Sequence, residues 1–173
     1  EQFKMKALLI IASRGYQDIE YGTPRKILEQ AGIEIVVASK NGGACVGKLG
    51  GIVKDTIALA DVMVESYDAI IFIGGPGAVS YQQDVEAHKI AREAVEKHKW
   101  LAAICIAPTI LAYAGVLNGR KATVWNEDGR QDKILRDNGA KFTGAAVTQE
   151  AKLITANGPE AAELFGNAIL KAL

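Results

Sequence analysis

The sequence has few cysteines, few aromatic residues and no excess of charge of either sign. Its 173 residues include two cysteines and 6% aromatic residues, and twenty basic side chains balance twenty acidic ones. A chain of this size does not need a disulfide to hold its core, so we expect Cys45 and Cys105 to be free thiols. Because no block of Lys and Arg is present, we expect neither nucleic acid nor a membrane surface as a partner.

Long apolar runs and clustered metal ligands are also missing. No apolar run approaches the roughly 18 residues that span a bilayer, and the N-terminal residues lack a signal-peptide pattern, which predicts a cytoplasmic protein. His88 and His98 are not spaced with the cysteines as metal ligands would be, so we expect no metal and no cofactor. With 49% apolar and 23% charged residues, the chain has the composition of a folded globular protein.

Apolar runs rich in β-branched residues alternate with segments of helical period, which predicts an α/β fold with a mostly parallel sheet flanked by helices. The expected strands are residues 7–12, 33–38, 68–73, 101–104, 121–125, 145–148 and 153–155. The expected helices are residues 17–31, 83–97, 108–114, 129–138 and 160–173. Glycine-rich residues 42–61, with alternating stretches at 45–46 and 52–57, predict an added β-ribbon. We expect one domain over residues 5–173, with residues 1–4 an expression remnant or a frayed terminus.

Ligands of open α/β sheets bind beyond the carboxyl ends of the strands, where three loops stand out: residues 15–20, 74–77 and 105–108. Cys105 lies between a strand and a helix start, where unpaired N–H groups favour a thiolate. This arrangement predicts a nucleophile elbow, with the N–H of Ile106 directed at a reacting carbonyl oxygen. The turn at Gly74 and Gly75 ends a neighbouring strand, and the N–H of Gly75 is the expected second oxyanion donor.

Each of these motifs also has a purely structural interpretation. Free cysteine is among the most buried residue types, so Cys105 taken alone is compatible with a core position. The sequence Gly-Gly-Pro-Gly is compatible with a simple turn, and it is not a phosphate loop because no Gly-Lys-Ser/Thr follows.

Taken together, these residues resemble the ThiJ/PfpI superfamily, a class I glutamine amidotransferase-like group. The resemblance rests on Glu20, on the YDAII run (67–71) leading into Gly74 and Gly75, on AAIC (102–105) followed by Pro108, and on NGP (157–159). The superfamily includes the parkinsonism-associated protein deglycase and intracellular proteases. The resemblance implies a flavodoxin-like sandwich and a homodimer or larger homo-oligomer. It also implies that Cys105 is the nucleophile and that Glu20 hydrogen-bonds to its sulfur, a role that needs a carboxyl group with a raised pKa.

The chain departs from this family at the histidine positions. The protease members carry His after the nucleophile, where this chain has Ile106, and an acidic residue beyond the Gly-Gly turn, where residues 78–83 contain none. The deglycase members carry His where this chain has Trp125, which we therefore place at the substrate site. We expect His88 and His98 to be surface residues, so that no histidine serves as general base.

The leading functional interpretation is a cysteine-dependent stress-response protein. It would act on a small-molecule carbonyl substrate, a reactive aldehyde, as a glyoxalase or deglycase does, or serve as an oxidation-sensitive thiol protein. The alternatives are a cysteine peptidase or amidase and a non-enzymatic dimeric chaperone or regulator. Apolar ribbon residues such as Leu49, Ile52 and Val53 are candidates for the subunit contact.

Overall fold

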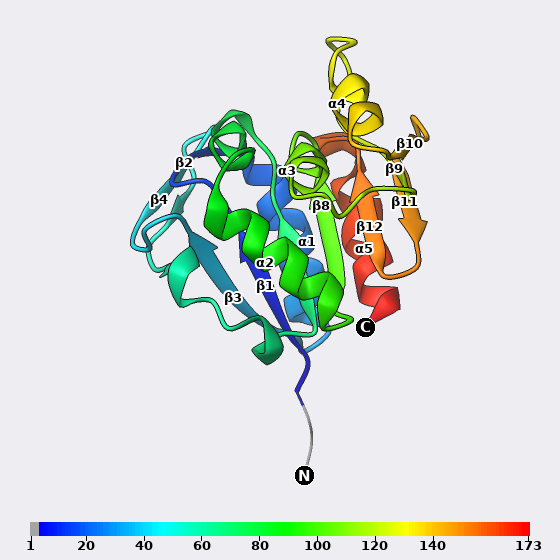
Figure 1. Ribbon diagram of the computed structural model, residues 1–173. Coiled ribbons are helices and arrows are strands. Elements are labelled where there is room, and N and C mark those ends of the chain that lie inside the picture. The colour runs from blue at the N-terminus through cyan, green and yellow to red at the C-terminus, as the bar shows by residue number, and fades with distance from the viewer. Residues whose placement is uncertain (1–3) are drawn as a thin grey trace.

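The computed structural model describes residues 4–173, so the expectation for residues 1–4 falls almost entirely outside the described residues. Its centre is a seven-stranded sheet in the order β11-β12-β8-β7-β1-β3-β6, parallel except for β11 (Figure 1). The strands are β1 Lys6–Ile10, β3 Glu34–Ser39, β6 Ile57–Ala58, β7 Ala69–Phe72, β8 Trp100–Ile104, β11 Val147–Glu150 and β12 Leu153–Ala156. The predicted α/β architecture with a mostly parallel sheet is therefore confirmed.

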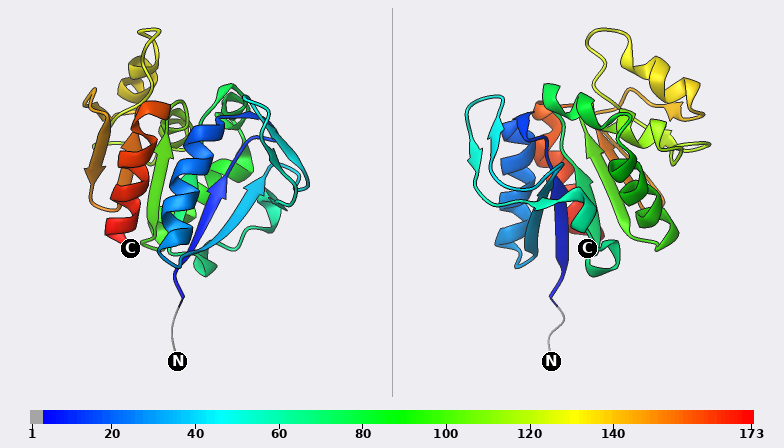
Figure 2. Two further views of the ribbon diagram at one scale, coloured as in Figure 1. Left: turned by 180° about the vertical axis from the view of Figure 1, so that it is seen from behind. Right: turned by 60° about the vertical axis from the view of Figure 1, so that its left-hand side comes forward.

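Helices cover both faces of this sheet. The helices α2 (Val85–Glu96) and α3 (Pro108–Tyr113) cover one face, and α1 (Asp18–Gln30) and α5 (Ala162–Ala172) cover the other (Figures 1 and 2). A shorter helix, α4 (Gln131–Asp137), stands at the end of the sheet where the parallel strands finish. Helix α1 and helix α5 pack on each other as well as on the sheet.

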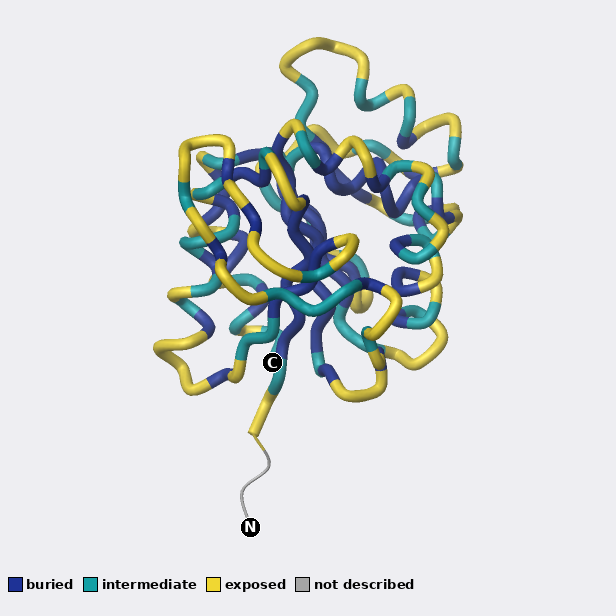
Figure 3. Tube along the Cα trace, turned by 90° about the vertical axis from the view of Figure 1, so that its left-hand side faces the viewer, coloured by how far each residue is buried: buried dark blue, intermediate teal, exposed yellow. Residues whose placement is uncertain are grey.

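The sheet is buried on both faces because alternate residues of each central strand enter different layers of the core. In β1, Leu8 and Ile10 pack under α2 and α3, whereas Ala7 and Leu9 pack under α1 and α5. The same alternation places Ile70 and Phe72 of β7 in the first layer. This two-sided burial explains why the strands read as continuous apolar runs, and the tube in Figure 3 shows the buried strands at the centre.

Two small sheets flank the main one. The first consists of β2 (Arg14–Tyr16), β4 (Cys45–Gly47) and β5 (Ile52–Val53), in which β4 and β5 form the antiparallel ribbon. The second pairs β9 (Lys121–Ala122) with β10 (Lys141–Phe142). Four short 3-10 helices complete the described elements: Leu59–Asp61, Val64–Ser66, Pro76–Tyr81 and Pro159–Ala161.

Three local expectations need correction. The expected strand 121–125 ends at Ala122, because the N–H of Thr123 turns to the Oγ1 of Thr155 instead of a neighbouring strand (3.0 Å). The expected second arm of the ribbon, residues 52–57, is divided: only Ile52–Val53 pairs with β4, while Ile57 begins the edge strand β6 beside β3. Val53 is buried in the core, so it is not available for a subunit contact.

No helix among residues 4–173 is long and apolar enough to cross a membrane.

Candidate active site

Cys105 occupies a sharp turn between β8 and α3. Its φ of 65° lies in the left-handed region, which a side chain adopts only when its surroundings impose it. Two backbone bonds do so: the N–H of Cys105 donates to the carbonyl of Ala156 (2.9 Å), and its carbonyl accepts from the N–H of Trp125 (2.9 Å). The expected elbow between strand and helix is therefore present, and Cys105 is partly exposed.

Glu20 lies in the first turn of α1 and is fully buried. The N–H of Gly74 donates to its Oε1 (3.0 Å). Its Oε2 has no hydrogen-bond partner of ordinary length among residues 4–173. Gln17 begins the helix, since its side-chain oxygen accepts from the N–H groups of Ile19 (2.7 Å) and Glu20 (3.0 Å). The buried carboxyl group is thus fixed by a hydrogen bond to Oε1, and Oε2 is the oxygen that can carry a proton.

Gly74 shows how closely Glu20 and Cys105 approach each other. A Cβ atom at Gly74 would lie 2.5 Å from Oε1 of Glu20 and 2.6 Å from Cβ of Cys105. Both side chains therefore lie close to the position that a Cβ of Gly74 would occupy. The structure brings together the two residues that the sequence places 85 positions apart.

The expected oxyanion donors lie around the Cys105 sulfur. The backbone groups of Ile106 and Gly75 lie near this sulfur and lower the pKa of its thiol, against the larger effect of burial. Gly75 has a φ of 110°, and a Cβ there would lie 2.5 Å from the backbone nitrogen of Gln17, so no other residue fits without displacement. The carbonyl of Gly74 accepts from the N–H of Gln17 (2.9 Å), which ties this turn to the start of α1.

The pKa of the Cys105 thiol is raised, whereas the sequence led us to expect a low one. Burial raises the pKa of Glu20 to about 7, against smaller lowering effects from the Cys105 thiol, the Gly74 N–H and the charge of Lys48. Burial also raises the pKa of Cys105 to about 12, and the Glu20 carboxylate adds to this rise. The two N–H donors do not outweigh these effects. Because α3 has only one and a half turns, its dipole is too small to reverse them. At neutral pH the thiol is therefore protonated, and Glu20 is the group that titrates.

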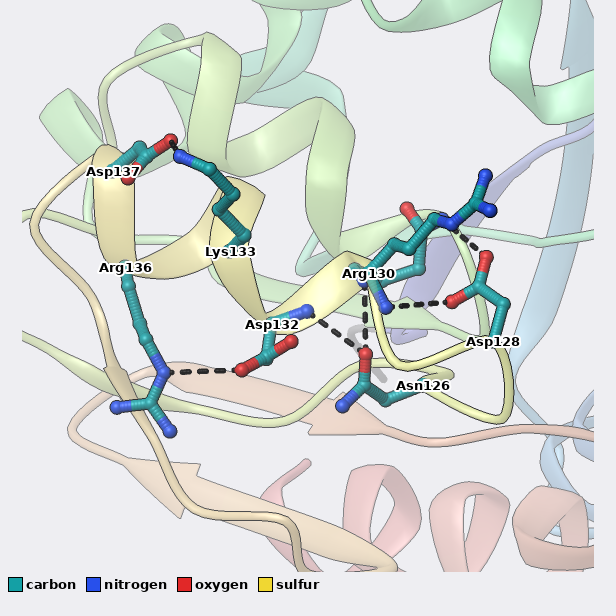
Figure 4. A network of polar contacts seen from close by, with 8 residues as sticks. Asn126, Asp128, Arg130, Asp132, Lys133, Arg136 and Asp137 are labelled. Carbon is teal, nitrogen blue, oxygen red and sulfur yellow. Dashed lines mark hydrogen bonds and ion pairs between the residues drawn. The ribbon is translucent and has the colours of Figure 1, made fainter.

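Trp125 lies beside the elbow, as its backbone bond to Cys105 shows, and its indole N–H donates to Glu127 (3.1 Å). The loop that follows is held by Asn126, whose side-chain oxygen accepts from the N–H groups of Gln131 (2.9 Å) and Asp132 (3.0 Å) (Figure 4). This cap begins α4 and gives the loop a defined path.

The histidines lie elsewhere. His88 is partly buried, with its ring Nε2 2.7 Å from the carbonyl oxygen of Gln82, and His98 is exposed at a turn. Neither is among the groups that act on the Cys105 thiol. Within residues 4–173 no three His, Cys, Asp or Glu side chains gather as metal ligands do.

Sequence reasoning missed two residues that build the site. Gln17 holds both α1 and the Gly74 turn, and Ala156 accepts the N–H of Cys105. A polar residue at the start of a predicted helix is a sequence signal for the first. Nothing in the sequence marks the second, because it acts only through its backbone.

These features define an α/β protein with a cysteine on a nucleophile elbow and a buried carboxyl group beside it. The chain belongs to the DJ-1/PfpI family, whose family model matches residues 5–172. A protein of Methanocaldococcus jannaschii without an assigned function is 34% identical over 97% of this chain and 82% of its own length. A protein of Pyrococcus horikoshii named as a deglycase is 32% identical over 90% of this chain and 91% of its own length.

Relatives and solved structures agree on the fold and carry different names. A Bacillus subtilis protein provisionally named a cysteine protease is 30% identical over 97% of this chain and 98% of its own length. The crystal structure of a ThiJ/PfpI domain protein from Brachyspira murdochii superposes with a TM-score of 0.92 at 28% identity, covering 99% of both chains. The crystal structure of Drosophila melanogaster DJ-1beta gives a TM-score of 0.88 at 28% identity, covering 99% of this chain and 91% of that one.

Proposed function

We propose that this protein is a cysteine-dependent enzyme that acts on small reactive aldehydes, with Cys105 as nucleophile and Glu20 as general acid/base. The observation that carries the proposal is the state of Glu20. Its carboxyl group is fully buried, packs with Cys105 against the same glycine, and has its pKa raised to about 7. A pKa near the working pH is the property that a group needs to accept and return a proton in one catalytic cycle.

The first step is addition of the thiol to the aldehyde. Since the thiol is protonated at neutral pH, the Glu20 carboxylate accepts its proton while the sulfur forms a bond to the carbonyl carbon. The π electrons of the carbonyl pass to its oxygen, which the N–H groups of Gly75 and Ile106 stabilise. Protonated Glu20 then returns the proton to that oxygen, and the product is a hemithioacetal.

A 2-oxoaldehyde allows a second step with the same two groups. Glu20 removes the proton from the carbon bound to sulfur and delivers one to the neighbouring carbon, while the hydroxyl proton passes to the oxygen of that neighbouring carbon. The hemithioacetal thereby becomes the thioester of a 2-hydroxy acid. Water then hydrolyses the thioester and frees the Cys105 thiol. The net reaction adds one water to the aldehyde and needs neither an oxidant nor a cofactor.

The direct test is consumption of methylglyoxal and formation of the 2-hydroxy acid by the purified protein. We expect Cys105→Ser to abolish turnover and Glu20→Gln to lower kcat by roughly 10²- to 10⁴-fold, the usual contribution of a general acid/base. Cys45→Ala is the matched control, since Cys45 is fully buried in strand β4 of the ribbon, and it should retain activity. Full turnover by Cys105→Ser would place the chemistry elsewhere.

A peptide amide substrate separates this proposal from the protease interpretation. Cysteine peptidases use a histidine beside the nucleophile to protonate the leaving amine, and no histidine acts on the Cys105 thiol. We therefore expect no release of amine from the wild-type protein. Cysteine-dependent peptide cleavage would instead assign the protein to peptide hydrolysis.

A further inference from the structure

A small pocket lies at the end of the sheet opposite to Cys105. It has a volume of about 120 Å³, with Val95 and Leu101 contributing apolar surface. It adjoins the starts of β8 and β12, which are the lower ends of these strands in Figure 1, whereas Cys105 follows the other end of β8. Leu101 of β8 lines the pocket, and Cys105 lies four positions further along the chain, or about 13 Å away at the usual rise per residue. The pocket is therefore not part of the candidate active site.

Every polar side chain that lines this pocket is basic. The four are His98, Lys99, Arg120 and Lys152, and we call them the basic pocket. Among residues 4–173, none of these four takes part in an ion pair. This concentration of charge is unusual in a chain whose net charge is zero.

Two carboxylates of the surrounding segments bond to groups outside the pocket, and one of them, Glu65, also lies near Lys99. Glu65 pairs with Lys97 (3.4 Å), and a carboxylate oxygen of Glu150 accepts the backbone N–H of Lys121. The positive charge of the pocket is therefore not neutralised by a side chain that lines it. An anion from solution would supply the missing counter-charge, and the concave shape focuses the positive potential on that position.

The cationic groups are also held in place by the protein. The ammonium of Lys152 donates to the carbonyl of His98 (2.9 Å), and the ammonium of Lys99 donates to the carbonyl of Glu65 (3.2 Å). Each of these bonds uses one of three N–H donors and leaves two for a ligand. Arg120 is only partly exposed and adds a planar guanidinium, which can bind two oxygens of one oxyanion.

The backbone around the pocket is strained in the same way as the elbow. Three non-glycine residues among those described have a positive φ: Cys105, His98 (56°) and Ala151 (51°). The first is the candidate nucleophile, and the other two both line the basic pocket. Strained residues of this kind persist where the surrounding structure holds them and often mark functional sites.

We propose that the basic pocket binds a phosphate group, either as inorganic phosphate or as the phosphate of a small monoester. The volume suits one such group, and the guanidinium with two ammonium groups matches its oxygens and its charge. A nucleic acid strand would need an extended basic surface instead of a single small pocket. The site is separate from the aldehyde chemistry and does not depend on it.

The test is an NMR titration of the full chain at constant ionic strength, set with sodium chloride in a buffer that contains no oxyanion. Inorganic phosphate forms one arm and glycerol 3-phosphate the other. We expect saturable shifts of the backbone N–H signals of Lys99, Arg120 and Lys152 in at least one arm. Equal affinities would show that the phosphate group alone is recognised, and tighter binding of the ester would identify a small organic phosphate.

Arg120→Gln should weaken the binding at least tenfold, because it removes both charge and the paired donors. Arg130→Gln makes the same change of charge at an exposed residue near α4 and should bind as the wild type does. Arg120→Lys keeps the charge and serves if Arg120→Gln does not fold, with an intermediate loss expected. Absence of saturable shifts in the wild type, or equal affinity in the wild type and a folded Arg120 variant, would overturn the proposal.

Discussion

The carboxyl group of Glu20 is fully buried, and the function that we propose for it needs it to ionise. A buried carboxylate is unfavourable unless it is well solvated by donors, and here one N–H, from Gly74, reaches it. The result is a pKa raised to about 7, so the group is about half ionised at neutral pH. The property that suits it to proton transfer also lowers the stability of the fold at higher pH.

The effect on stability can be measured with Glu20→Gln. The folded pKa of about 7 lies above the ordinary 4.5, so the folded chain binds the proton more tightly than the unfolded chain. The free energy of unfolding of the wild type should therefore fall as pH rises from 4.5 through 7, by up to about 3 kcal/mol from this group. Gln cannot ionise, so the variant should lack this decrease and become the more stable protein at pH 8. Urea unfolding from pH 4.5 to 8 tests this, and parallel curves for the two proteins would contradict it.

Reactivity of the two thiols gives a second prediction at this scale. Iodoacetamide should modify the partly exposed Cys105 much faster than the fully buried Cys45. Because the pKa of Cys105 is raised to about 12, its alkylation rate should keep rising with pH beyond 9 instead of reaching a plateau near neutrality. Mass spectrometry of each cysteine against time at several pH values measures both. A plateau below pH 8 would show that the thiolate is stabilised and that the pKa of Cys105 is low, as the sequence predicted.

Gly74 separates the two candidate catalytic side chains, and Gly74→Ala tests that contact. The added Cβ would lie within 2.7 Å of Glu20, Cys105 and the carbonyl oxygen of Ile104, in a region without free space. We expect a loss of roughly 1–3 kcal/mol in the free energy of unfolding, as for overpacked cores, together with loss of activity. Gly22→Ala is the control: it lies within α1 with nothing inside 4 Å of the new Cβ, so it should stabilise the helix slightly. Equal melting temperatures for the two variants would disprove the close packing.

At the scale of single residues, the sequence predicted where the candidate site residues lie, but it did not predict the pKa of Cys105. The position of Cys105 after a strand predicted the elbow, and the family resemblance predicted that Glu20 lies beside it, as the closeness of both side chains to Gly74 shows. The raised pKa of Cys105 could not be predicted, because it depends on how deeply the sulfur is buried and on the carboxylate brought to it from α1. Those are properties of the packed fold.

At the scale of elements, segments with a clear pattern were predicted, and the bounds of the two-residue strands β6 and β9 were not. Helices α1 and α2 and the strands β1, β3, β7 and β8 all appear within a few residues of their expected bounds. The two-residue strands β6 and β9 depend on which neighbour offers a partner. For example, the Oγ1 of Thr155 accepts the N–H of Thr123, which would otherwise have continued β9, and no local sequence pattern predicts this bond.

The β4–β5 ribbon is attached to the start of α1 through Asp18. Its two carboxylate oxygens accept the N–H groups of Leu49 (2.7 Å) and Gly51 (2.8 Å) across the turn of the ribbon. Asp18→Ala should release this turn and cost about 1–3 kcal/mol of stability, with faster hydrogen exchange at Leu49 and Gly51. Asp18→Asn retains an acceptor and should lose less. Unchanged exchange in Asp18→Ala would show that the turn is held by other contacts.

On the scale of the whole molecule, one end of the sheet carries the elbow and the opposite end carries the basic pocket. A third feature lies over the ribbon and the start of α1. Exposed apolar side chains gather there, and we call them the ribbon patch: Ile19 (46% exposed), Val46 (40%), Leu49 (62%) and Ile52 (67%). The bonds of Asp18 to the ribbon turn bring Ile19 beside Leu49, and Val46 pairs with Ile52. Large apolar residues grouped in this way are typical of subunit contacts.

We propose that the ribbon patch forms the contact of a homodimer, and Ile52→Asp tests it. In a symmetric dimer the same patch lies on both subunits, so one substitution introduces two carboxylates into the interface, where burying an unpaired charge is strongly unfavourable. Sedimentation velocity should give a dimer for the wild type and a monomer for Ile52→Asp. Val85→Asp is the matched control, because Val85 is 77% exposed at the start of α2, outside the patch, and this variant should remain dimeric. A wild type that sediments as a monomer at tens of micromolar, or an Ile52→Asp protein that stays dimeric, would rule out this contact.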